Sequence, residues 1–157
     1  MAWSASKIFV ETIEDILANT TAIDLNSDTF KIALYDNDIT PDQTVVSAST
    51  AYGVGQWVTT GNEVSDTTEW PVTGQALGSV TWASAAAVLT FDAANEVSDG
   101  TSATLLNVYG CLIYDDTIVT PVADQGLCYL YFGGVNSVTD GTLTVAFHAS
   151  GIFTLTL

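Results

Sequence analysis

One histidine, two acidic pairs and a few glycine-rich turns are the features of this chain that could do chemistry. The histidine, His148, ends the alternating segment Thr142–His148 and shares its face with Thr144 and Ala146. A catalytic histidine needs an oriented partner. The chain has no G-x-S-x-G nucleophile motif and no arginine to clamp a carboxylate or phosphate. We therefore predict that His148 is a surface or hydrogen-bonded residue and that the chain is not an enzyme.

The acidic pairs, Asp36–Asp38 and Asp115–Asp116, offer the oxygen ligands that Ca²⁺ prefers, provided that the fold brings them together. The sequence has no D-x-D-x-D-G series, and carboxylates in turns commonly accept backbone hydrogen bonds. The same objection applies to a polysaccharide hydrolase built on the second pair and His148. We therefore predict no metal and no cofactor, and keep the calcium site and the hydrolase as alternatives.

The two cysteines, Cys111 and Cys128, lie in apolar runs typical of strands. They lack the C-x₂-C spacing of zinc sites, so buried reduced thiols are favoured over a metal site or a disulfide. The glycine-rich pieces at Tyr52–Gly55 and Gly133–Gly134 lack the strand-to-helix context of a phosphate loop. We predict that both are turns.

Basic residues are almost absent, because Lys7 and Lys31 stand against 18 Asp and Glu, and the formal net charge is -16. Binding to nucleic acid depends on cationic contacts with phosphates, and anionic membranes attract cations in the same way. We therefore predict no nucleic-acid partner and no membrane partner.

Charged residues make up 13% of the chain, against about 25% in ordinary domains. A surface of hydroxyl and small side chains loses little side-chain entropy when a partner covers it. This composition favours a docking surface. The alternative is an acidic domain whose charge only prevents aggregation.

The length of 157 residues predicts one domain, 1–157. Within residues 1–20 we expect an amphipathic helix that is capped by Ser6, begins near Lys7 and ends at Asn19. Its apolar side is formed by Ile8, Phe9, Ile13, Ile16 and Leu17. No secretory signal or membrane-length apolar run is present in the sequence, so we expect synthesis in a host cytoplasm.

Residues 29–157 show strand-like alternation separated by turn residues, apart from a long loop at 37–71 with a short strand near Gln56–Thr59. The pattern predicts a mainly β fold: an antiparallel β-sandwich, or barrel-like sandwich, of about seven to nine strands with one N-terminal helix. The predicted strands are Thr29–Tyr35, Gln75–Trp82, Ala87–Phe91, Ala103–Asp115, Leu127–Phe132, Thr142–His148 and Ile152–Leu157.

Four aromatic residues are candidate interface anchors: Trp3, Phe9, Trp57 and Trp70. For Trp3, we expect an anchor either in the core or in a neighbouring subunit. An alternative reading makes Trp57 and Trp70 an exposed carbohydrate-binding platform.

Several segments, in order and spacing, resemble a family of small virion proteins of tailed bacteriophages. They are Thr29–Tyr35 (TFKIALY), Asn62–Val64 (NEV), Gly74–Leu77 (GQAL), Val80–Trp82 (VTW), Leu89–Asp92 (LTFD), Gly110–Asp116 (GCLIYDD), Tyr129–Gly134 (YLYFGG), Gly141–Thr144 (GTLT) and Gly151–Thr154 (GIFT). The chain departs from the family at Ser65–Trp70, where a Gly-Tyr-rich stretch is expected, and in its N-terminal helix.

This resemblance implies a β-sandwich that decorates or cements a capsid, with no catalytic residues to carry over. We expect a head decoration or minor capsid protein on the exterior of the virion, whose partners are the major capsid protein and other copies of itself, as trimers near local threefold positions. The alternative is a tail- or fibre-associated protein that binds host-surface carbohydrate.

Overall fold

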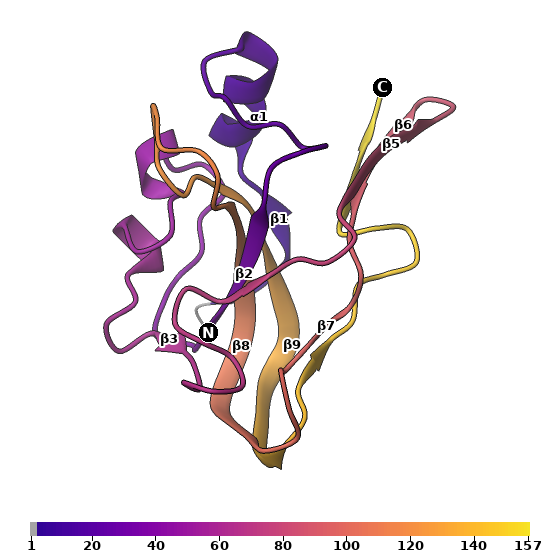
Figure 1. The fold of residues 1–157 in the computed structure, drawn as a ribbon. Helices are drawn as coiled ribbons and strands as arrows, with labels where there is room; N and C mark the ends of the chain where they lie inside the picture. The colour runs from indigo at the N-terminus through magenta and orange to yellow at the C-terminus, as the bar shows by residue number, and fades with distance from the viewer. Residues whose placement is uncertain (1–2) are drawn as a thin grey trace.

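The computed structural model describes residues 3–157 and is mainly β, with antiparallel strand pairs and one α-helix, α1 (Val10–Ala18) (Figure 1). These residues form eleven strands rather than the expected seven to nine, because five strands are only two residues long. Two 3₁₀ helices, η1 (Ser47–Ser49) and η2 (Gly55–Trp57), lie in the long loop. The strands are β1 (Lys7–Ile8), β2 (Phe30–Tyr35), β3 (Glu63–Val64), β4 (Gln75–Ala76), β5 (Thr81–Ala85), β6 (Val88–Asp92), β7 (Glu96–Val97), β8 (Ala103–Asp115), β9 (Gly126–Gly141), β10 (Thr144–Val145) and β11 (Phe153–Thr156).

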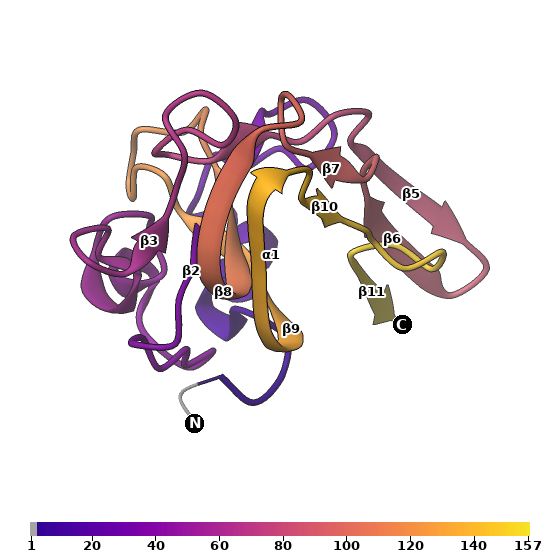
Figure 2. The same cartoon turned by 90° about the horizontal axis from the view of Figure 1, so that it is seen from below.

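The largest sheet has the strand order β1-β9-β8-β2-β3, and β4 pairs with the other end of β2. The long antiparallel strands β8 and β9 form its centre (Figure 2). Their sequences are rich in β-branched and aromatic residues, which favour the extended backbone. The predicted bounds of β8 are confirmed.

The large sheet is buried on both faces, as β2 shows. Its even-numbered side chains pack in one hydrophobic cluster, while Ala33 and Tyr35 pack in a second cluster on the opposite face. The predicted alternation is confirmed, and both faces of this strand are covered. Lys31, on the second face, forms a salt bridge of 3.0 Å with Asp116.

Two small sheets lie along one side of the large sheet, one with the order β11-β6-β5 and one formed by β7 and β10 (Figure 2). Phe91 of β6 is the centre of the packing between the layers. Its ring centroid lies 5.1 Å from that of Phe30 on β2 and 5.2 Å from that of Phe153 on β11. These aromatic contacts join the small sheet to the main hydrophobic core.

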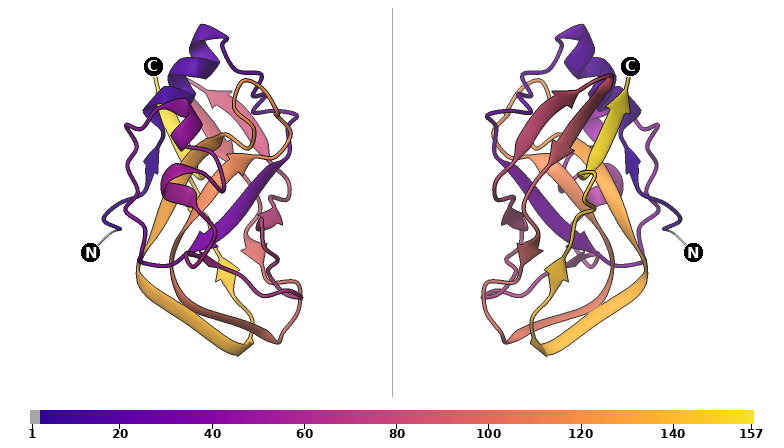
Figure 3. Two further views of the ribbon diagram at one scale, coloured as in Figure 1. Left: turned by 90° about the vertical axis from the view of Figure 1, so that its left-hand side faces the viewer. Right: turned by 90° about the vertical axis from the view of Figure 1, so that its right-hand side faces the viewer.

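The second cluster lies on the other face of the large sheet, beneath the N-terminal segment and the long loop. Figure 3 (left) shows α1 and the two 3₁₀ helices in front of the strands on this side. Trp3, Phe9 and Trp57 are fully buried in this cluster. The segments without long strands therefore act as a covering layer for the sheet.

The N-terminal helix forms, but it begins later than predicted. Lys7 and Ile8 pair with Tyr129 and Cys128 as β1, so Ser6 is not the cap, and α1 begins at Val10. As a strand, Lys7 and Ile8 satisfy backbone N–H and C=O groups on the edge of β9. If these residues were helical, those groups of β9 would lack this partner. The helix ends at Asn19, as predicted, in a left-handed conformation with φ 56°.

Four other segments differ from expectation. The strand predicted at Gln75–Trp82 is split into β4 and β5, and the one predicted at Thr142–His148 is reduced to β10. Gln56–Thr59 contains part of η2 rather than a strand. Gly133 and Gly134 lie inside β9, where several extra residues bulge opposite β8 instead of turning the chain.

Cys111 and Cys128 are buried free thiols, which confirms the prediction. Burial raises the pKa of both thiols. Within residues 3–157, no helix has the length and apolar character needed to span a bilayer.

Candidate functional site

The four aromatic residues expected at an interface are fully buried within the chain itself. Trp3, Phe9 and Trp57 lie in the second cluster, and Trp70 lies in the core between the layers. The structure therefore contradicts the expectation that these side chains are exposed to a partner. It also contradicts the carbohydrate platform of Trp57 and Trp70.

Trp3 shows why these aromatics serve the fold. Its indole Nε1 donates a hydrogen bond of 2.6 Å to the carbonyl of Asp36, and its ring meets Trp57 edge-on at 5.9 Å. A Cβ at Gly110 would collide with the Trp3 ring and with the Leu130 carbonyl. The absence of a side chain at Gly110 therefore leaves space for the Trp3 indole. Because the two residues are far apart in the sequence, local sequence patterns do not reveal this contact.

The two acidic pairs lie at opposite ends of β2. Asp115 is paired with Phe30 at the start of this strand, whereas Asp36 follows Tyr35 at its end. At about 3.3 Å per residue they are roughly 20 Å apart, so a calcium site shared by both pairs is contradicted. Among residues 3–157, no group of three or more His, Cys, Asp and Glu is placed to hold a metal ion.

Asp115 is fully buried, which is rare for a carboxylate. Its Oδ1 accepts hydrogen bonds from the backbone N–H groups of Thr117, at 2.7 Å, and Ile118, at 3.2 Å. Its Oδ2 has no hydrogen-bond donor. Burial, together with the adjacent Asp28 carboxyl, raises the pKa of Asp115 to about 7. The carboxyl group of Asp115 is therefore protonated below neutral pH.

His148 is exposed in the segment between β10 and β11. Its Nδ1 accepts a hydrogen bond of 3.1 Å from the backbone N–H of Ser150. The prediction that His148 is a surface or hydrogen-bonded residue is therefore confirmed.

The outer face of the β5–β6–β11 sheet carries small and hydroxyl side chains. The inner face carries Trp82, Phe91 and Phe153, which pack on the core. Side chains alternate along strands, so the residues between them point outward. The strand pairing sets these outward residues in two rows, Ala83–Thr90–Thr154 and Ala85–Val88–Thr156. Asp92 and Thr81 lie opposite each other at the end of this face. We call the two rows the threonine–alanine face.

One border of this face is β5, which pairs only with β6 in the part of the chain that is described. No charged residue occurs in the sequence between Glu69 and Asp92, a span that includes all of β5. Edge strands of natural proteins generally carry lysine, proline or a bulge that prevents pairing with other chains. The exposed, uncharged edge of β5 is therefore suited to contact another protein.

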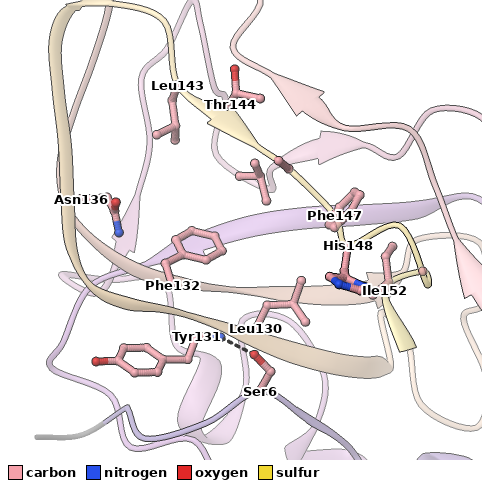
Figure 4. A pocket seen from close by; sticks show the side chains of 13 residues that line it. Ser6, Leu130, Tyr131, Phe132, Asn136, Leu143, Thr144, Phe147, His148 and Ile152 are labelled. Atoms are coloured by element: carbon pink, nitrogen blue, oxygen red, sulfur yellow. Dashed lines mark hydrogen bonds between the residues drawn. The ribbon is translucent and has the colours of Figure 1, made fainter. Parts of the chain in front are cut away.

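A cleft of about 490 Å³ opens between β9 and the segment that contains β10 (Figure 4). Leu130 and Phe132 point from β9 into this cleft, toward Phe147 and Ile152 on its other wall, whereas Tyr131 points away. The amide of Tyr131 donates a hydrogen bond of 3.0 Å to Ser6 Oγ. The cleft is thus the partly open margin of the hydrophobic core.

Searches against protein-family models, curated proteins and solved structures gave no match for this chain. The resemblance to phage virion proteins therefore stays a prediction, supported by the order of the quoted segments.

Sequence reasoning did not find the threonine–alanine face, although one signal for it exists. The span between Glu69 and Asp92 is the longest without a charged residue, although residues 43–62 and 141–157 are also free of charge. The cleft has no comparable local signal, because its walls come from segments separated in sequence and joined only by the fold.

Proposed function

We propose that this chain is a decoration or minor capsid protein of a phage head, a non-enzymatic β-sandwich that binds the exterior of the assembled shell in many symmetric copies. The observation that carries the proposal is the threonine–alanine face. It is a surface of short side chains with one carboxylate, Asp92, at its end and an open strand edge at its border, on a chain of net charge -16.

Short side chains favour docking for a physical reason. Alanine has no rotamer entropy to lose and threonine has little, so covering this face costs less than covering lysine or glutamate. The free edge of β5 can add backbone hydrogen bonds to a strand of the shell protein. The partner proposed for this face is the major capsid protein.

Charge supports the same proposal. The acidic exterior repels packaged DNA and other virions, while the uncharged face limits repulsion where contact is made. Copies arranged as trimers at local threefold positions would match the symmetry of a shell.

Co-sedimentation with DNA-free shells of the encoding phage tests this function. We expect saturable binding of the purified chain. Ala83→Lys places a long charged side chain in the centre of the threonine–alanine face and should weaken binding at least tenfold. Ala18→Lys makes the same chemical change at the exposed end of α1, so it is the matched control and should bind as the native chain does.

Two results would overturn the proposal. The first is equal binding by both lysine variants, which would remove the face from the interface. The second is binding to purified tails, or to host glycans, without binding to shells, which would support the tail-associated alternative. Circular dichroism of both variants must show the native β signal for the comparison to be made.

A further inference from the structure

A second surface lies at the opposite edge of the same small sheet. The cleft of Figure 4 continues into a second hollow of about 390 Å³, and the two share Ser6, Leu130 and Ile152. The second hollow lies between β1, at Lys7, and the start of β11, at Phe153. Together they form one groove between the edges of two sheets, which we call the inter-sheet groove.

The floor of the inter-sheet groove is apolar and only partly covered. Leu130, Phe132, Phe147 and Ile152 are half-buried side chains that pack against the main core. Apolar side chains that enter the groove would extend this core and remove these residues from water. The groove therefore favours an occupant that presents several apolar side chains in a row.

Backbone groups are also available along one wall. In the described residues, β11 pairs with β6 alone. The N–H of Leu157 donates to the Ala87 carbonyl at 2.8 Å, and Leu155 lies opposite Leu89, so the hydrogen-bonded positions are the odd-numbered residues. In an antiparallel ladder the alternate residues, Thr154 and Thr156, direct their N–H and C=O groups to the free edge.

The charge of the groove differs from that of the rest of the molecule. Among the described residues that line it, none carries a carboxylate, although the chain has 18 Asp and Glu. The lining does include Lys7 and His148, two of the three basic side chains in the sequence. A carboxylate on an occupant would find a cation here and no acidic neighbour in the lining.

We propose that the inter-sheet groove binds an extended segment of a partner protein that adds as a strand to the free edge of β11. The segment spans about four to six residues, to match β11. It carries apolar side chains at alternate positions, which enter the groove, and a carboxylate that pairs with Lys7. This surface is separate from the β5 edge, so the proposal does not depend on the decoration function.

Selection from a library of random twelve-residue peptides on the immobilised full chain tests the proposal. We expect enrichment of sequences with apolar residues at alternate positions and at least one Asp or Glu. Amide chemical shifts of the chain should change at Thr154, Thr156 and Ile152 when the enriched peptide is added. Failure to enrich such sequences, or shifts confined to another surface, would overturn the proposal.

Matched variants isolate the strand edge and the charge. Thr154→Pro removes the outward N–H and should weaken peptide binding about tenfold, whereas Thr154→Val keeps that N–H and should bind normally. Lys7→Glu should weaken acidic peptides, and Ala83→Lys should have no effect. Equal binding by Thr154→Pro and Thr154→Val, or association of the chain with itself through the groove in place of peptide binding, would contradict it.

Discussion

At the residue scale, Asp115 is a buried carboxyl group whose charge state affects the stability of the fold. Asp115 is fully buried, and its pKa is raised to about 7 by burial and by Asp28. In the unfolded chain an aspartate has a pKa of about 3.9. Between about pH 4 and pH 7 the folded protein therefore binds more protons than the unfolded chain, and stability falls as the pH rises.

Asp115→Asn should remove this dependence. The side-chain amide can still accept the hydrogen bonds from Thr117 and Ile118, and it does not titrate in this pH range. From pH 5 to pH 8 we expect the native free energy of unfolding to fall by on the order of 2 kcal/mol more than that of the variant. Chemical denaturation at both pH values measures the difference.

The control for this prediction is Asp99→Asn, which removes one carboxylate from an exposed position. Burial also raises the pKa of Glu63 and Asp124, so the native chain has other sources of the same trend. Only the difference between the two variants reports on Asp115. An Asp115→Asn protein that loses as much stability as the control over this range would show that the pKa of Asp115 is not raised in the folded protein.

At the element scale, a close backbone approach holds the segment before β4 against β2 within the large sheet. Gly74 precedes β4 and has φ 74°, and a Cβ there would collide with the carbonyl of Ile32 on β2. Gly61 has a similar φ of 83° but open space around its Cα. A side chain at Gly74 would be disfavoured both by the positive φ and by the collision with β2. A side chain at Gly61 would be disfavoured by the positive φ alone.

Gly74→Ala should destabilise the protein by about 3 kcal/mol, because it adds a backbone collision to the strain of a positive φ. Gly61→Ala, the matched control, should cost about 1 kcal/mol from the conformational strain alone. Urea denaturation of both variants gives the two values. Equal losses would mean that β4 can move away from β2 without cost.

Element by element, the sequence predicted long strands better than short ones. The thirteen residues of β8 and the alternation of β2 follow from side-chain periodicity, which local sequence determines. The start of α1 does not, because pairing of Lys7 with Tyr129 depends on a strand more than a hundred residues away. The bulge at Gly133 also depends on pairing with a distant strand, in this case β8. A glycine pair is equally compatible with a turn and with a bulged strand, so the local sequence does not decide between them.

Candidate surfaces were harder to predict than strands, for a related reason. Aromatic side chains such as Trp57 are as common in cores as at interfaces, and only the tertiary fold decides between the two. The small residues of β5 give no positive motif, and their significance comes from lying on an open edge. Absence of charge over a long span was the signal available from sequence.

At the scale of the whole molecule, charge and surface chemistry are divided between regions. The chain carries 18 acidic side chains, whereas the two rows of the threonine–alanine face and the lining of the inter-sheet groove hold none. The free edge of β5 and the groove beside β11 lie at opposite edges of one small sheet, so this sheet can hold two contacts. This division is what a protein that binds a large assembly without enzymatic turnover requires.

Reconstruction of the intact virion by cryo-electron microscopy tests the central claim most directly. The account predicts repeated density that fits residues 3–157 on the outside of the head, with β5 and β11 turned toward the shell and the acidic surface turned outward. Density for the chain on the tail, or absence of the chain from purified virions, would contradict it.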